Sequence, residues 1–225
     1  MRTQTTSNET VEMYLKTIAE LSNGRSPIVI ARVAERLGVS PVSANEMMKR
    51  LVKQGYLKHE PYKGVTLTQS GQYIARNVIR RQRLWEVFLV EHLEFNWAGV
   101  YEAACRLEHA TSNVLAESLS NYLGNPTVCP HGNPIPTADG TVHVTEQRAL
   151  NTLTVGETAQ VVSIQPTQTK IFAYLSKRNI LPAQVVTVTD IAPMQGPITL
   201  KLDSAEVSLG LAMAALVMVG PLQTN

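Results

Sequence analysis

The stretch IARVAERLGVSPVSANEMMKRLVKQGYLKHEPYKGVTL, residues 30–67, decides the fold of the first part of the chain. Residues 30–37 have the apolar pattern of a short helix that stops at Gly38, because glycine is common just past a helix C-terminus. Ser40 and Pro41 have the residue types of an N-cap and a first helical turn, so they predict a second helix over residues 41–54. Its predicted buried side consists of Ala44, Met47, Met48 and Leu51. Two short helices around a tight turn indicate a helix-turn-helix, whose second helix enters the major groove of DNA.

A basic hairpin follows this second helix. Residues 56–59 and 65–67 are predicted to form two strands around a turn at residues 61–64. Lys58 and Lys63 are placed there to reach DNA phosphate. Upstream, residues 7–21 carry a helical apolar stripe made of Val11, Tyr14, Leu15, Ile18 and Leu21. Together these elements predict a winged helix-turn-helix DNA-binding domain over residues 1–73.

Charge is distributed unevenly along the chain. Residues 1–83 carry 14 Lys and Arg against 6 Asp and Glu, a net of +8, whereas residues 84–225 carry 6 against 12, a net of −6, which agrees with the formal net charge of +2. A basic first part joined to an acidic remainder is typical of a protein in which only the first part meets a polyanion. A solvated basic face is the alternative, and the helix-turn-helix pattern favours nucleic acid.

The composition is that of a globular protein, with 44% hydrophobic and 17% charged residues. The N-terminal stretch MRTQTTSNET lacks the apolar run of a secretory signal. The longest apolar run, residues 207–219, is shorter than the ~20 residues that cross a bilayer, so it predicts a buried strand or helix. Two cysteines do not make a disulfide framework. We therefore expect a protein of the reducing cytoplasm, without a membrane partner.

The stretch CRLEH, residues 105–109, places three metal-ligand side chains close together. On a helix at ~100° per residue, Cys105, Glu108 and His109 fall within about a quarter turn. The opposite, packing side is predicted to carry Ala103, Leu107, Ala110 and Val114. Thiolate, carboxylate and imidazole bind divalent transition metals. A surface Glu and His beside an incidental Cys is the alternative, and this stretch alone leaves both interpretations open.

Two residues outside this stretch favour the metal hypothesis. Met13 lies opposite the apolar stripe of the first helix, where it either packs against another element or offers its thioether as a ligand. Glu86 lies in RLWEVFLVEHL, residues 83–93, which is apolar on nearly all sides. An unpaired carboxylate there would be costly. Glu86 is therefore expected to have a partner, which is a cation, a hydrogen-bond donor or a metal.

Five motifs occur in order along the chain: TVEMYLKTIAEL at 10–21, VAERLGVS at 33–40, LTQSG at 67–71, CRLEHATS at 105–112 and GNPIP at 132–136. In these motifs the chain resembles the diphtheria toxin repressor family of metal-dependent transcriptional regulators. The resemblance covers residues 8–140 with specific motifs and the C-terminal part more loosely. It implies a metal-activated DNA-binding regulator, most often a repressor of metal-homeostasis genes.

The resemblance also implies metal ligands. The principal regulatory site of the family falls on Met13, Cys105, Glu108 and His109. The carboxylate of a second site falls on Glu86, but the two histidines expected near it are replaced by Gln82 and Tyr101. One regulatory site is therefore expected, and Glu86 either coordinates a metal in altered company or hydrogen-bonds Gln82 or an arginine.

The implied ligand set bears on the identity of the metal. Soft thioether and thiolate ligands favour iron(II), nickel or cobalt over manganese more than a site of oxygen and imidazole ligands would. Manganese-selective members of the family tend to carry carboxylates at the positions of Met13 and Cys105. The sequence therefore favours iron(II) as the cofactor, with manganese(II) as the alternative.

The base-facing positions of the family fall on the start of the predicted recognition helix, at Ser40, Val42, Ser43 and Glu46. Glu46 stands where a glutamine is usual. Because a Glu accepts a hydrogen bond from cytosine rather than reading adenine, the operator is expected to differ. Ser40 and the wing residue Lys63 are expected to position the protein on phosphates.

The rest of the chain divides into a helical part, a linker and a β-rich part. Residues 74–140 are predicted to form a helical metal-binding and dimerisation domain that ends in a Gly- and Pro-rich ordered linker. Cys129 and His131 in the linker have metal-ligand chemistry, but a Cys-x-His pair on a loop favours a structural role. Strands over 160–164, 184–191 and 198–202, with a helix over 169–178, predict a small β-barrel over 147–225 that resembles an SH3-like, FeoA-type domain.

The chain is thus expected to combine a mainly α N-terminal part, a winged helix-turn-helix plus a helical dimerisation domain, with a small SH3-like β-barrel. We expect a homodimer on a pseudo-palindromic operator. Residues 84–93 and the Ala103, Leu107 and Val114 face are the predicted dimer surface. The alternatives are a winged-helix regulator that answers an organic ligand or no ligand, with a vestigial metal site, and an enzyme with Cys105 as nucleophile and His109 as base. No orienting group or oxyanion-hole motif accompanies that pair, so an enzyme is not predicted.

Overall fold

The computed structural model of the chain describes residues 2–22, 27–143, 145–165, 168–194, 196–203 and 205–222. The chain forms two compact units. The first consists of residues 1–82, 107–118 and 136–141, and the second of residues 83–106, 119–135 and 142–225.

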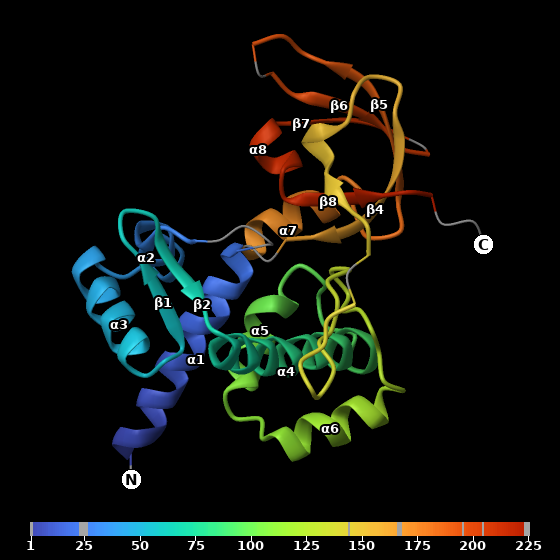
Figure 1. Ribbon diagram of the computed structural model, residues 1–225. Helices are drawn as coiled ribbons and strands as arrows, with labels where there is room; N and C mark the ends of the chain where they lie inside the picture. The colour runs from blue at the N-terminus through green and yellow to red at the C-terminus, as the bar shows by residue number, and fades with distance from the viewer. Residues whose placement is uncertain are drawn as a thin grey trace. The chain divides into compact units, whose positions relative to one another are not determined.

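The first unit contains the winged helix (Figure 1). Its elements are α1 (Arg2–Ser22), α2 (Ile30–Leu37), α3 (Pro41–Lys53), β1 (Leu57–Glu60) and β2 (Gly64–Leu67). The helix boundaries follow the capping residues: Gly38 ends α2 at a φ of 65°, and the Ser43 backbone N–H donates to Ser40 Oγ, 3.1 Å away, at the start of α3. The predicted helix-turn-helix and wing are confirmed.

The core of the winged helix is apolar side chains from all five elements. Its largest buried members are Tyr14, Leu15, Ile18, Met48, Leu51, Leu57 and Val65. Met47 is half-buried rather than buried as predicted. β1 and β2 are antiparallel, with Leu57 opposite Leu67. Gly64 is required in the hairpin, because its φ is 128° and a Cβ there would lie 2.1 Å from the Ile28 carbonyl oxygen.

Three helices follow the wing: α4 (Gln69–Leu93), α5 (Val100–Glu108) and α6 (Asn113–Tyr122). α5 ends at Glu108, where the Thr111 hydroxyl donates to the Leu107 carbonyl at 2.8 Å. The predicted packing side of this helix is therefore wrong. Its buried residues are Val100, Ala104 and Glu108, spaced four apart, while Val114 belongs to α6 and is 78% exposed.

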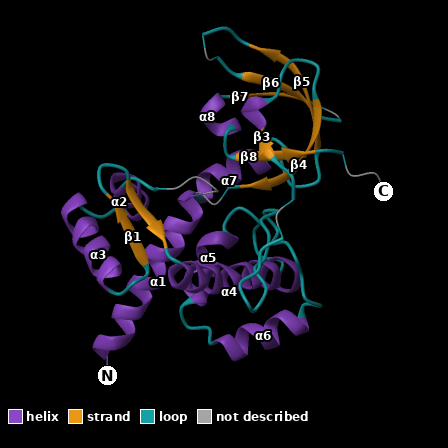
Figure 2. Ribbon diagram, in the orientation of Figure 1, coloured by secondary structure: helices purple, strands orange, loops and turns teal. Residues whose placement is uncertain are grey.

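The second unit contains a curved sheet of six strands in the order β3-β8-β4-β5-β6-β7, with all neighbours antiparallel (Figure 2). The strands are β3 (Arg148–Ala149), β4 (Thr158–Ile164), β5 (Val185–Ile191), β6 (Ile198–Lys201), β7 (Glu206–Leu209) and β8 (Val217–Gly220). Three short helical segments accompany them: η1 (Leu150–Thr152), α7 (Thr169–Ser176) and α8 (Leu211–Ala214). Phe172 and Leu175 of α7 are fully buried among the sheet residues. The β-rich C-terminal domain is confirmed.

The apolar run at residues 207–219 is divided between elements. It contributes most of β7, all of α8 and most of β8, rather than one strand or helix. Gly210 stands at the break, as the N-cap of α8. In the part of the chain that the structure describes, no helix is both long enough and apolar enough to cross a membrane.

Candidate metal centres and nucleic-acid interface

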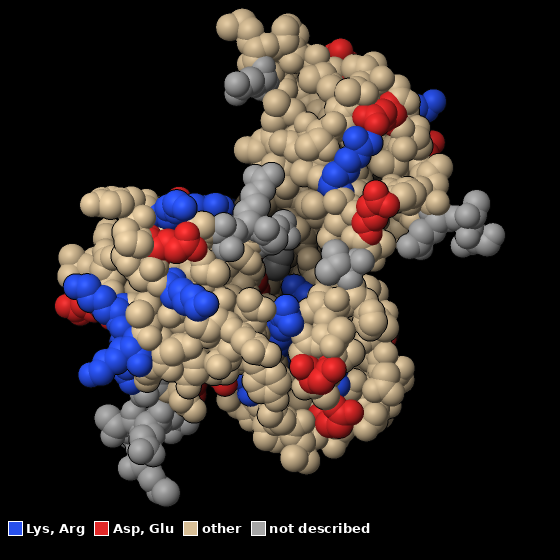
Figure 3. All heavy atoms as spheres, viewed as in Figure 1, with Lys and Arg blue, Asp and Glu red and all other residues tan. Residues whose placement is uncertain are grey.

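The outer face of α3 is exposed and polar. Val42 is 69% exposed, and Ser43 and Glu46 are exposed beside it. The Ser40 hydroxyl caps the helix and lies 2.9 Å from Ser43 Oγ. Lys and Arg side chains gather over the winged helix (Figure 3). The exposed ones are Arg32, Lys49, Arg50, Lys53, Lys58 and Lys63. This face has the charge and the accessible helix that contact with a DNA backbone needs.

The residues at the tip of the wing are exposed to solvent. Tyr62 is fully exposed at a φ of 64°. The Lys63 side chain is 71% exposed, and its Nζ is 3.8 Å from Glu60 Oε2. An exposed ion pair of this kind is weak, so Lys63 can exchange Glu60 for a phosphate at little cost.

The CRLEH stretch supplies a buried carboxylate to the first unit. Glu108 is 2% exposed, and the Lys16 ammonium of α1 donates to both of its oxygens, at 2.9 Å and 2.7 Å. Burial raises the pKa of the Glu108 carboxyl to about 7, although the Lys16 charge opposes that rise. Glu108 is thus a carboxylate that depends on a neighbouring cation to remain ionised.

His109 contacts two carboxylates. Its Nδ1 is 3.0 Å from Glu12 Oε2, and its Nε2 is 3.4 Å from Glu108 Oε1. Glu12 Oε1 also accepts a hydrogen bond from Arg81 at 2.8 Å. Burial alone would raise the pKa of the Glu12 carboxyl, but the hydrogen bonds from His109 and Arg81 outweigh it and lower that pKa. These contacts bring α1 against the C-terminal end of α5.

The other two predicted ligands lie on the same two helices. Met13 follows Glu12 on α1 and is 37% exposed, off the core stripe as predicted. Cys105 is half-buried and lies one turn before Glu108 on α5. Met13 belongs to the first unit and Cys105 to the second.

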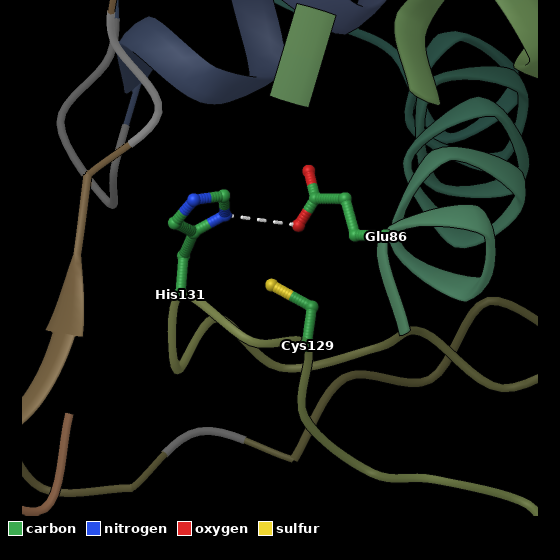
Figure 4. Close-up of side chains that lie close together, drawn as sticks. All are labelled: Glu86, Cys129 and His131. Atoms are coloured by element: carbon green, nitrogen blue, oxygen red, sulfur yellow. Dashed lines mark hydrogen bonds and ion pairs between the residues drawn. The ribbon is translucent and has the colours of Figure 1, made fainter. Parts of the chain in front are cut away.

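A second group of metal-ligand side chains lies in the second unit (Figure 4). One donor atom each from Glu86, Cys129 and His131 lie within 4.8 Å of one another, and all three residues are buried. Within the described ranges, no other group of three His, Cys, Asp or Glu residues meets that distance. Glu86 projects from α4, while Cys129 and His131 come from one loop, with the Cys129 sulfur directed into the space between the other two side chains.

Three contacts fix the orientation of the His131 ring. Its Nδ1 is 3.1 Å from Glu86 Oε2, and its Nε2 is 3.1 Å from the Trp97 carbonyl oxygen. Because a carbonyl only accepts, Nε2 carries a hydrogen, and Nδ1 is the nitrogen that faces the cluster. The ring stacks on Phe172 with 4.1 Å between centroids. A histidine held through one nitrogen in this way presents the other to a ligand.

The loop conformation that carries Cys129 and His131 is set by backbone contacts. The Ile164 N–H donates to the His131 carbonyl at 2.9 Å, and the Gly132 N–H donates to the Cys129 carbonyl at 2.8 Å. Gly132 has a φ of 78°, and a Cβ there would lie 2.0 Å from the Val162 carbonyl oxygen. Only glycine fits this turn, so Gly132 sets the positions of Cys129 and His131.

Electrostatics couples the three side chains. Burial would raise the pKa of the Glu86 carboxyl, but the hydrogen bond and charge of His131 outweigh it, and the pKa is lowered. Burial and the Glu86 charge raise the pKa of the Cys129 thiol well above its ordinary value. A divalent cation bound to the cluster would displace the thiol proton of Cys129 and the hydrogen that His131 Nδ1 donates to Glu86.

Sequence reasoning identified Glu86 but not its partners. In the structure Glu86 Oε2 is 3.1 Å from His131 Nδ1, and the Cys129 thiol and the Arg83 charge also act on the Glu86 carboxylate. Cys129 and His131 were assigned a structural role, and the structure gives them the geometry of ligands as well. The usable signal was the combination of a Cys-x-His-Gly loop with a buried carboxylate that needed a partner.

These elements define a winged-helix protein that carries metal-ligand side chains outside its DNA-facing helix. Three family models match the chain: the N-terminal DNA-binding domain of iron-dependent repressors over residues 7–65, their metal-binding and dimerisation domain over 68–137, and the FeoA domain over 148–221. The chain belongs to the diphtheria toxin repressor family of metal-dependent transcriptional regulators.

The relatives agree with these models. The iron-dependent repressor IdeR of Mycobacterium tuberculosis is 38% identical over 128 residues, which are 57% of this chain and 56% of the relative. The diphtheria toxin repressor of Corynebacterium jeikeium is 34% identical over 131 residues, 58% of this chain and 55% of the relative. The chain thus spans little more than half the length of these curated relatives.

Solved structures match over nearly the whole chain. A manganese-dependent transcriptional repressor in complex with manganese has a TM-score of 0.88 and 34% identity, covering 94% of this chain and 100% of that one. ScaR with bound zinc has a TM-score of 0.84 and 27% identity, covering 94% of this chain and 99% of that one.

Proposed function

We propose that this chain is a metal-dependent transcriptional repressor that binds operator DNA as a homodimer and is activated by a divalent metal ion. The observation that carries the proposal is the contact between α1 and the end of α5, made by the Lys16–Glu108 and Glu12–His109 pairs. α1 packs in the core of the winged helix, so a metal ion that joins it to α5 acts directly on the DNA-binding elements.

The regulatory site of this proposal consists of Met13 from α1, Cys105 and Glu108 from α5, and His109 directly after α5. The donor set fits a divalent transition metal, because it combines a thioether, a thiolate, a carboxylate and an imidazole. The buried, cation-dependent Glu108 carboxyl supports the same assignment. The soft sulfur donors favour iron(II), with manganese(II) as the alternative, and relatives named for each metal occur.

Glu86, Cys129 and His131 form a second metal site in this proposal. A carboxylate, a thiolate and an imidazole within 4.8 Å of one another fit a transition metal. His131 would bind through Nδ1 while the Trp97 carbonyl orients its ring. The resemblance to ScaR, solved with bound zinc and with bound cadmium, supports a site that accepts such ions.

In this proposal, metal binding shifts the equilibrium between conformations of the protein toward the one that binds DNA. An ion held by side chains of both α1 and α5 favours the arrangement in which paired recognition helices fit successive major grooves. DNA then tightens metal binding by the same factor, because coupling between two binding sites is reciprocal. Ser43, Val42 and Glu46 read bases, while Ser40 and Lys63 contact phosphates. The role is regulatory rather than enzymatic, and it belongs to the cytoplasm.

A mobility-shift experiment tests the proposal. DNA selected by the protein from a random pool is incubated with the full chain and iron(II), manganese(II) or a chelator. The shifted band is expected with either metal and is lost with the chelator. An organic-ligand regulator with a vestigial metal site would instead give the same band under all three conditions.

A further inference from the structure

Lys16 holds the central carboxylate of the proposed regulatory site. The residue is 5% exposed, and its ammonium donates to both oxygens of Glu108, which is 2% exposed. Lysine is rarely buried unless it is paired, so this ion pair is a property of the fold rather than of a mobile surface. A metal ion that takes Glu108 as a ligand meets a positive charge already in place.

We propose that Lys16 is a tethered cation that competes with the divalent metal for Glu108 and so sets the metal concentration at which the protein responds. This inference rests on the proposed function, because it requires Glu108 to be a metal ligand. The competition has two origins. The metal replaces a contact made to both carboxylate oxygens, and an ammonium a few ångströms away repels a divalent ion in a medium of low dielectric constant.

A second carboxylate lies on the same helix as Lys16. Glu20 lies four residues after Lys16, on the same face of α1, and its side chain is 8% exposed. The Glu20 charge acts on Glu108 as well, so the two carboxylates lie in one electrostatic environment. The Glu20 carboxylate lies 3.9 Å from Arg36 and adds a second negative charge on the helix of Lys16.

The same geometry limits the number of ions at Glu108. One divalent ion and one ammonium share the neighbourhood of a single buried carboxylate, and a second divalent ion would need Lys16 to leave altogether. Lys16 thus favours one ion at this site.

Cobalt(II) titration tests the inference, because absorption bands report its ligation by thiolate. The background is Cys129→Ser, which leaves Cys105 as the one thiol of the chain. Lys16→Gln removes the charge and keeps a hydrogen-bond donor, Lys16→Arg keeps the charge, and Lys177→Gln removes an exposed charge in the second unit as the matched control.

At a pH high enough to ionise Glu108 in both proteins, Lys16→Gln is expected to tighten cobalt(II) binding about tenfold or more, because the resident cation is gone. Lys16→Arg is expected to bind at or below the affinity of the parent, and Lys177→Gln at the same affinity. In the presence of a chelator, Lys16→Gln should unfold at a lower temperature than the parent and gain more from added metal.

Two outcomes separate the inference from the function on which it rests. Unchanged or weaker binding by Lys16→Gln, or tighter binding by Lys16→Arg, overturns the role of Lys16 if His109→Ala abolishes the thiolate signal. The Lys16→Arg result decides the matter if Lys16→Gln fails to fold. A full thiolate signal from His109→Ala would show instead that the proposed regulatory site is wrong.

Discussion

Replacing His131 with phenylalanine tests whether the buried cluster in the second unit is held by electrostatics. Phenylalanine keeps a ring of similar size against Phe172, which stacks on His131 at 4.1 Å. The substitution removes both ring nitrogens. Glu86, 2% exposed, then loses the hydrogen bond that lowers its pKa, and the Trp97 carbonyl loses its donor.

The expected cost follows from these two losses. A buried charge deprived of its partner costs about 3–5 kcal/mol, and the Arg83 charge beside Glu86 places the value near the lower end. The orphaned carbonyl adds about 1 kcal/mol. His131→Phe is therefore expected to lower the free energy of unfolding of this unit by about 4 kcal/mol.

Urea unfolding followed by tryptophan fluorescence measures this loss, because both tryptophans, Trp85 and Trp97, lie in the second unit. A chelator keeps metal from stabilising the parent protein. Glu86→Gln on the His131→Phe background is the control, since it removes the buried charge and should recover about 2 kcal/mol. A cost below about 1 kcal/mol, or a further loss on adding Glu86→Gln, would refute the ion-pair reasoning.

Three further predictions concern DNA, protons and assembly. Lys63→Ala should weaken binding to all DNA sequences alike and reduce the slope of log affinity against log salt concentration by about 1, whereas Glu46→Gln should change the preferred bases. Binding-site selection at two salt concentrations would show if these two roles are reversed. Because the Cys129 pKa is raised, metal binding must release its proton, so affinity at the buried cluster should rise with pH; competition titrations in which Cys129→Ser keeps the full slope would contradict this. The chain should sediment as a dimer at micromolar concentration with metal present, and a monomer there would count against the proposed assembly.

The boundaries of the winged-helix elements could be predicted well from the sequence, because local contacts determine where each helix begins and ends. Gly38 and the Ser40–Pro41 pair mark helix ends through their own backbone conformations, and α2 begins and ends where the sequence indicated. The wing follows similarly from the turn at residues 61–64 between two short antiparallel strands. The helix over residues 169–176 was found from its apolar pattern, although its end was placed two residues too late.

Burial around CRLEH could not be read from a helical wheel. The wheel assumed one helix through Val114, but the chain leaves helical geometry after Glu108. Glu108 therefore lies on the buried side, opposite to the expectation, and its burial is tolerated because Lys16 arrives from a helix 92 residues earlier. Such a partner is chosen by tertiary packing, which no local pattern contains.

The second cluster was missed for the same physical reason. The apolar surroundings of Glu86 in the sequence indicated that it needs a partner. The sequence offered several partners and gave no distance between Glu86 and any of them. His131 lies 45 residues away and reaches Glu86 only because Gly132 turns the loop and Phe172 supports the ring. The resemblance implied the ligands of the principal site. The neighbours of Glu86, which are Cys129 and His131, were found only in the structure.

The most direct test of the central claim is fluorescence anisotropy of labelled operator DNA, titrated with the full chain in metal and in chelator. The wild-type chain is expected to bind at least about tenfold more tightly with metal, the usual size of an allosteric coupling. His109→Ala and Cys105→Ser should bind equally in both conditions, while circular dichroism and sedimentation show an unchanged fold and dimer. A wild-type chain indifferent to metal, or a full metal response in both variants, would contradict the account.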